Sequence, residues 1–135
     1  MEGELSSVLK DIVDTPVSPE LLPPDENGQI SQKTEDLVGP YDLHDFYLYY
    51  FLRWGFKPSK IYRLACIAFD GQFTPDVIYK WEETFIRRFF NQQFKRSCLP
   101  DGPKVGTVTL SPRGDWRMPS DAVSKLWLDD LKSVL

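Results

Sequence analysis

The chain has 135 residues and a formal net charge of -4, and 41% of its residues are hydrophobic, 14% aromatic and 27% charged. This length and composition fit one folded domain with a hydrophobic core, and they exclude a disordered chain. The acidic balance argues against a general nucleic-acid-binding surface. The charge is uneven, however: residues 1–40 carry two lysines against nine acids, whereas residues 41–135 carry 14 cations and 11 acids.

The first third of the chain combines a short predicted helix with a proline-rich segment. Apolar residues recur at helical spacing over residues 5–13. Four prolines follow within residues 16–24, where they remove the backbone N–H groups and the torsional freedom that regular structure needs. Residues 14–28 are therefore predicted to form a long loop, either a disordered linker or a mobile flap over an active site.

Three strong helices are predicted next, and glycine and proline signals mark their ends. They span residues 42–54, 58–69 and 75–97. The helix over residues 42–54 is apolar around most of its circumference, so other elements must cover it on several sides. His44 lies on its apolar side and is predicted to be structural.

After residue 103 the sequence predicts a loop with one short strand over residues 107–110, and a last helix over residues 120–131. The fold class is thus mainly α. The apolar helix faces exceed what a chain of this length is expected to cover, so we expect it to be part of a larger protein or to form a homo-oligomer.

Cysteine and histidine usage bears on metal binding and on the cellular compartment. Cys66, Cys98 and His44 are too few and too far apart for a zinc framework, so we expect reduced thiols and no metal. Neither a bilayer-spanning apolar run nor a signal-peptide pattern is present. We expect a cytoplasmic protein without a membrane partner.

The segment over residues 94–117 has the most unusual composition, with cations set among Pro/Gly turns. These cations are Lys95, Arg96, Lys104, Arg113 and Arg117. Because lysine and arginine form charge-assisted bonds with phosphate and carboxylate, the segment fits an anion-binding loop, or else an ordered surface clasp. Cations in the last turn of a helix also interact favourably with the negative end of the helix dipole, which gives Lys95 and Arg96 a second explanation. No catalytic constellation or glycine-rich phosphate loop accompanies these residues, so by themselves they indicate an anion site and no reaction.

Several strings, in chain order, resemble the C-terminal part of bacterial NAD synthetases. They are residues 15–23 (TPVSPELLP), 32–41 (QKTEDLVGPY) and 94–97 (FKRS), together with 99–105 (LPDGPKV) and 110–117 (LSPRGDWR), which are similar to the long, glutamine-dependent form. The resemblance covers nearly all of residues 1–135. It implies the helical C-terminal segment of an α/β adenine-nucleotide alpha-hydrolase-like domain, without its parallel sheet.

The resemblance also implies an activity. Family members are ATP-dependent carbon–nitrogen ligases that use ATP and magnesium to adenylate the nicotinic acid carboxylate of deamido-NAD. Ammonia from a nitrilase-type glutaminase domain then displaces AMP and gives NAD. The implied partners are deamido-NAD, ATP, and the N-terminal synthetase and glutaminase parts of the same protein.

Site residues follow from the same resemblance. It places Ser18 near the ATP phosphates and Lys95 on deamido-NAD. Phe94 stands where the short, ammonia-dependent enzymes have a histidine, which removes one hydrogen-bond donor and suits the long form.

The remaining positions receive supporting roles in this hypothesis. Residues 14–38, which include Glu35, correspond to a mobile flap that closes over the substrates. Arg96 and Lys104 support the loop, and residues 113–117 are scaffold or a subunit contact.

Two family motifs are missing from the sequence: the Ser-Gly-Gly-x-Asp-Ser pyrophosphate loop and the Glu-Lys-Cys glutaminase site. We therefore expect a C-terminal piece that holds no catalytic residue and does not form NAD alone. The alternative is a stand-alone helical interaction module, which uses residues 95–117 to bind an anionic partner.

Overall fold

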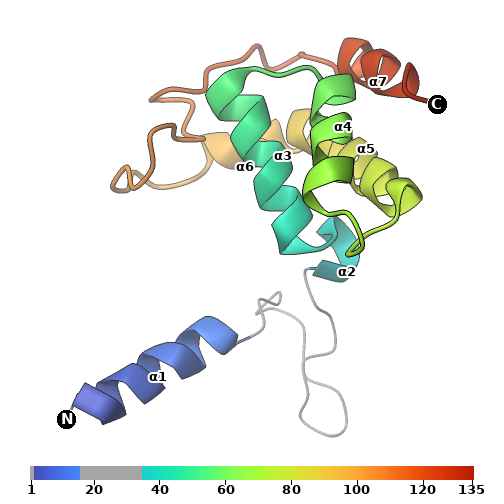
Figure 1. The fold of residues 1–135 in the computed structure, drawn as a ribbon. Coiled ribbons are helices and arrows are strands. Elements are labelled where there is room, and N and C mark those ends of the chain that lie inside the picture. The colour runs from blue at the N-terminus through green and yellow to red at the C-terminus, as the bar shows by residue number, and fades with distance from the viewer. Residues whose placement is uncertain (1, 16–34) are drawn as a thin grey trace, which may run out of the picture. The chain divides into compact units, whose positions relative to one another are not determined.

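The computed structural model describes residues 2–15 and 35–135, and it divides the chain into two units, residues 1–39 and 40–135. The N-terminal unit contains α1 (Glu2–Asp14) and α2 (Glu35–Val38) (Figure 1). α1 includes the helix predicted over residues 5–13, which is confirmed. Residues 16–34, most of the predicted flap, lie outside the described residues.

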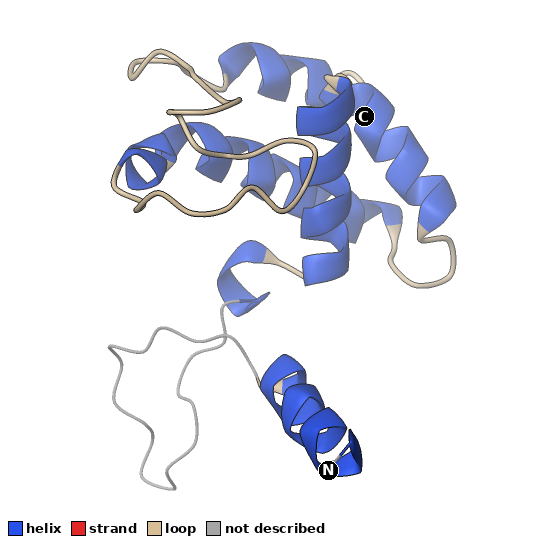
Figure 2. Cartoon of the chain, turned by 90° about the vertical axis from the view of Figure 1, so that its left-hand side faces the viewer, coloured by secondary structure: helices blue, strands red, loops and turns tan. Residues whose placement is uncertain are grey.

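The C-terminal unit is built from helices joined by turns and one long loop (Figures 1 and 2). Its helices are α3 (Tyr41–Trp54), α4 (Pro58–Ala68), α5 (Pro75–Asn91), α6 (Gln93–Ser97) and α7 (Lys125–Lys132). The mainly helical prediction is confirmed. No helix in the described part of the chain has both the length and the apolar character needed to cross a membrane.

The strand predicted over residues 107–110 is wrong, because these residues belong to the irregular loop between α6 and α7. The backbone N–H of Thr109 donates to Asp115 Oδ2 at 2.9 Å. A bond within the loop thus satisfies this N–H group, which in a sheet would pair with a neighbouring strand.

Glycine and proline mark several helix boundaries as predicted. Gly55 has a φ of 61° and ends α3. Its N–H and that of Phe56 donate back to Phe51 O and Tyr50 O, each at 3.2 Å. Glycine adopts this left-handed conformation without steric cost, which explains why the helix ends there.

The long helix predicted over residues 75–97 is broken at Gln92, which separates α5 from α6. In a continuous helix the carbonyl of Phe89 would accept a hydrogen bond from the amide four residues later. Here the guanidinium of Arg96 donates to that carbonyl at 2.9 Å. A side-chain donor thus stabilises the break.

The last helix starts at Lys125, later than the predicted residue 120. The N–H of Ala122 donates to Pro119 O at 3.1 Å, so the residues before α7 form a turn instead of a first helical turn.

The core lies where α3, α4, α5 and α7 meet, and α5 provides the largest share of it. The buried apolar residues are Leu43, Tyr47, Phe51, Ile61, Ala65, Ile78, Phe85, Ile86, Phe89, Phe90, Leu128 and Leu131. His44 lies at the edge of this core, with its ring against Phe85 in an edge-on contact at 5.3 Å. On α3, Tyr49 and Trp54 remain about half exposed, so the chain covers most of this apolar helix by itself.

One acid lies inside this core. Glu82 on α5 is 1% exposed, and neither of its carboxylate oxygens has a hydrogen-bond partner among the described residues. Burial, with a smaller contribution from the charge of Asp130 on α7, raises the pKa of this carboxyl from 4.5 to about 9. Glu82 is therefore protonated at neutral pH.

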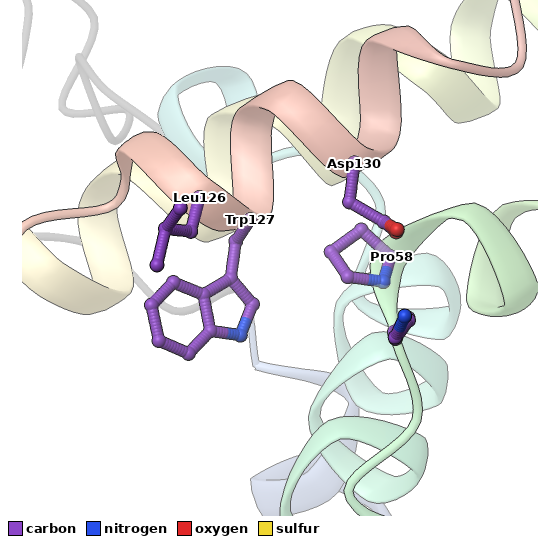
Figure 3. A pocket seen from close by; sticks show the side chains of 5 residues that line it. Pro58, Leu126, Trp127 and Asp130 are labelled. Carbon is purple, nitrogen blue, oxygen red and sulfur yellow. The ribbon is translucent and has the colours of Figure 1, made fainter.

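Asp130 also connects α7 to the start of α4. Its carboxylate accepts a hydrogen bond from the N–H of Ser59 at 2.9 Å. The residue at the N-cap of α4 is Lys57, whose side chain makes no capping bond. The Asp130 carboxylate from α7 caps the N-terminus of α4 instead, and its negative charge interacts favourably with the positive end of the helix dipole. A cavity of about 350 Å³ opens beside this contact, between Pro58 and Trp127 (Figure 3).

Replacement of Glu82 is expected to remove a pH dependence of stability. Between the unfolded pKa of 4.5 and the folded value of about 9, the folded chain holds a proton that the unfolded chain releases. Stability therefore falls by about 1.4 kcal/mol for each pH unit across this range. In Glu82→Gln this slope is absent. The free energy of unfolding of the variant, relative to that of the wild type, should therefore rise by about 3 kcal/mol between about pH 5 and pH 7. Urea unfolding at several pH values measures it.

Glu83→Gln is the matched control, because Glu83 is the next residue but forms an ion pair with Arg87 at 2.7 Å on the outer side of α5. Its profile should run parallel to that of the wild type. If the Glu82→Gln profile is parallel as well, Glu82 is ionised in the fold and our assignment is wrong.

Candidate anion-binding site on α6

α6 carries the two cations that the sequence places at the end of a helix, Lys95 and Arg96. A helix of five residues is not stable by itself, so its neighbours must hold it. The side-chain amide of Gln93 donates to Ser120 O at 2.9 Å. The guanidinium of Arg96 lies over the ring of Phe89, 4.4 Å from its centroid. α6 is thus bound both to α5 and to the segment before α7.

The charge of Arg96 points inward. Besides the carbonyl of Phe89, its guanidinium contacts Met118 Sδ at 3.3 Å. Burial lowers the pKa of this group. Arg96 therefore supports the turn between α5 and α6, and its Nη2 is directed toward protein atoms.

Lys95 points to solvent. It is exposed on α6, and no hydrogen bond or ion pair of its ammonium is found within the part of the chain that the structure describes. The neighbouring Phe94 is 59% exposed. Lys95 therefore presents an ammonium that can reach an anionic ligand.

Two ion pairs close the loop that follows α6. Arg113 Nε donates to Asp101 Oδ1 at 2.6 Å, and Lys104 Nζ lies 2.7 Å from Asp115 Oδ2. Hydrogen bonds from Lys104 and from the N–H of Thr109 lower the pKa of the Asp115 carboxyl. Two cations of this loop thus form ion pairs with acids of the same loop. Residues 101–115, which these pairs connect, form an ordered clasp.

Trp116 attaches the clasp to the core. Its ring lies 5.5 Å from that of Phe89 and 5.9 Å from that of Phe51, measured between centroids. Aromatic pairs at such distances add stability beyond the area they bury. The loop and α6 therefore both rest on the same aromatic cluster.

The predicted site residues that the structure describes belong to two units. Lys95 and Arg96 share α6, and Lys104 lies in the clasp. Glu35 lies in the first turn of α2, in the N-terminal unit, and Ser18 is outside the described residues. No cluster of three or more His, Cys, Asp or Glu side chains in residues 2–15 and 35–135 could hold a metal ion.

Lys95 lies outside the main cavities. The cavity in Figure 3 is lined by α4 and α7 residues, and two others of about 340 and 320 Å³ are lined by α3, the loop and the core aromatics. None of these three has Lys95 in its wall, so the ammonium lies on an open surface.

Glu82 has no role in the prediction from the sequence, and Arg113 has only that of a scaffold or subunit contact. Glu82 was detectable, because it lies four residues after Ile78 and three before Phe85, on the apolar face of α5. The contacts of Arg113 were not detectable, since they depend on how a loop of irregular backbone folds back on itself.

No model of a known protein family matches the chain. Among known proteins, it is 42% identical to the glutamine-dependent NAD(+) synthetase of Mycobacterium leprae, over 97% of this chain and 22% of that protein. The glutamine-dependent NAD(+) synthetases of Mycobacterium bovis and Mycobacterium tuberculosis are also 42% identical, over 95% of this chain and 21% of their own length.

These relatives belong to the ligases. The chain resembles the C-terminal part of glutamine-dependent NAD(+) synthetases, and it spans about a fifth of their length. The resemblance stated from the sequence is thereby confirmed.

Removal of the Arg96 guanidinium should destabilise the chain, whereas removal of the Lys95 ammonium should not. Arg96→Met loses the bond to the Phe89 carbonyl and the contact with its ring, which together are worth about 1–2 kcal/mol. Lys95→Met, in the same short helix, should change the free energy of unfolding by less than about 0.5 kcal/mol. Thermal and urea unfolding of both variants measure the difference, and equal effects would contradict the inward role of Arg96.

Proposed function

We propose that this chain provides part of the deamido-NAD site of a glutamine-dependent NAD synthetase that works in the cytoplasm. In this proposal the complete enzyme adenylates deamido-NAD with ATP and amidates it with ammonia derived from glutamine. The observation that carries the proposal is the exposed ammonium of Lys95, held on a short helix whose other cation faces inward. The sequence similarity to the synthetases supports it.

The chemistry of Lys95 suits binding. A lysine ammonium acts as a compact point charge toward phosphate or carboxylate, and deamido-NAD carries both kinds of group. In our proposal Lys95 binds the substrate and moves no proton. Ser18 binds on the ATP side, and the flap over residues 14–38, which includes Glu35, closes over the substrates.

Magnesium would obtain most of its ligands from other parts of the enzyme, because the described residues form no acidic cluster suited to a metal ion. The helices of the C-terminal unit would pack beside the parallel sheet of the synthetase domain. Association into a homo-oligomer belongs to the same proposal.

The arrangement of charges favours this proposal over the interaction module. An acidic partner would need several free cations along residues 95–117. Ion pairs occupy Lys104 and Arg113, and Arg96 is directed inward. The segment therefore offers two exposed cations without an ion pair among the described residues, Lys95 and Arg117, rather than a broad basic surface.

Lys95→Ala in the complete synthetase that carries this segment should weaken deamido-NAD binding. Loss of one charge-assisted contact is worth about 1.5–3 kcal/mol, so KM for deamido-NAD should rise about 10- to 100-fold. KM for ATP should change little. Steady-state kinetics with each substrate varied in turn measure both values.

Lys125→Ala is the matched control, since Lys125 is an exposed helical lysine that forms an ion pair with Asp129 at 2.6 Å. Its kinetics should equal those of the wild type. An unchanged KM for deamido-NAD in Lys95→Ala would refute the proposed role of Lys95.

The 135-residue chain alone should form no NAD from deamido-NAD, ATP, magnesium and ammonia. The reason is that its sequence lacks the pyrophosphate loop that the resemblance requires. A coupled assay for NAD on the purified chain tests this expectation, with the complete synthetase as the positive control. Measurable turnover by the chain would show that the catalytic groups are present within it.

A further inference from the structure

The C-terminal end of α6 depends on a side chain from the loop. The carbonyls of Lys95 and Arg96 accept hydrogen bonds from the N–H groups of Cys98 and Leu99, each at 3.3 Å. The next carbonyls, at the point where the chain leaves the helix, need donors from elsewhere.

Arg113 supplies those donors. Its Nη1 donates to Ser97 O at 3.4 Å, its Nη2 donates to Leu99 O, and its Nε donates to Asp101 Oδ1 at 2.6 Å. One planar guanidinium thus contacts three acceptors spread over residues 97–101. It connects the end of α6 to a loop segment that lies 14–16 residues further along the chain.

We propose that Arg113 is a positioning residue for Lys95: its contacts with Ser97, the last residue of α6, and with Leu99 and Asp101 just after it fix the end of α6, so that the Lys95 ammonium is held where the substrate anion binds. This inference rests on the proposed function of Lys95. Arg96 and Gln93 hold the other side of the same short helix. Lys95 therefore lies between two anchored ends, with its own charge directed to solvent.

The contacts of Arg113 suit positioning better than stabilisation. Its side chain is 46% exposed and that of Asp101 is 86% exposed. Exposed ion pairs contribute little to the free energy of folding. A fork that bonds three acceptors, however, restricts the geometry of a helix too short to be stable alone.

The same geometry predicts that lysine cannot replace Arg113. A lysine keeps the positive charge but lacks the planar fork. Arg113→Lys should therefore behave like Arg113→Gln. If charge alone mattered, Arg113→Lys would behave like the wild type.

The test is steady-state kinetics on the complete synthetase that carries this segment. Arg113→Gln and Arg113→Lys are each made in the wild type and in a Lys95→Ala background. The control is Arg87→Gln, because Arg87 is 53% exposed and also forms an exposed ion pair at 2.7 Å, but on α5. Hydrogen–deuterium exchange of residues 97–101 reports the order of the segment directly.

We expect Arg113→Gln and Arg113→Lys to raise KM for deamido-NAD about 5- to 10-fold, a typical size for coupled residues. The values of kcat and of KM for ATP should stay within about twofold. Exchange over residues 97–101 should accelerate, while Arg87→Gln should change none of these quantities. In the Lys95→Ala background Arg113→Gln should add less than about a twofold effect, because its action passes through Lys95.

Two results would overturn the inference while the role of Lys95 stands. One is an unchanged KM in both Arg113 variants although Lys95→Ala raises it. The other is an equal effect of Arg113→Gln with and without Lys95, since that would show an action on some other group. If Lys95→Ala leaves KM unchanged, the proposed function fails, and this inference fails with it.

Discussion

The packing of Phe89 connects the helical core to the site that we propose. Its ring contacts Phe51 and Trp116 and also supports the Arg96 guanidinium. Its carbonyl accepts the hydrogen bond from Arg96. A single residue thus joins α3, α6 and the loop clasp. Protein interiors are closely packed and transmit strain. A shift of the Phe89 ring would therefore move both α6, which carries Lys95, and the loop that follows it.

Much of the fold could be predicted from local signals. Gly55, Pro58 and Pro75 lie at helix boundaries because their backbone preferences act within one or two residues. The break at Gln92 could not be predicted, since the residues around it have good helical spacing and the donor that stabilises it comes from Arg96. The strand expected near Thr109 failed for a similar reason, because the irregular loop meets the hydrogen-bonding needs of this backbone through the Asp115 carboxylate.

The candidate site, too, could be predicted only where it depends on local sequence. The sequence predicted that Lys95 and Arg96 would lie at a helix end and that their segment could bind an anion. It could not separate the cations from one another, because Lys104 and Arg113 have acidic partners 11 and 12 residues away in the chain. Only the folded loop distinguishes the paired cations from Lys95. The similarity to NAD synthetases then gives this one exposed ammonium a chemical context.

The buried carboxyl of Glu82 has a consequence for the energetics of the whole chain. The formal net charge of -4 counts Glu82 as ionised, but the folded chain keeps it neutral and so carries one negative charge fewer at pH 7. When the chain unfolds in neutral solution, Glu82 returns to water and gives up its proton, which the buffer then binds. Folding is thus coupled to proton uptake. The enthalpy measured for unfolding therefore includes the protonation enthalpy of whichever buffer surrounds the protein.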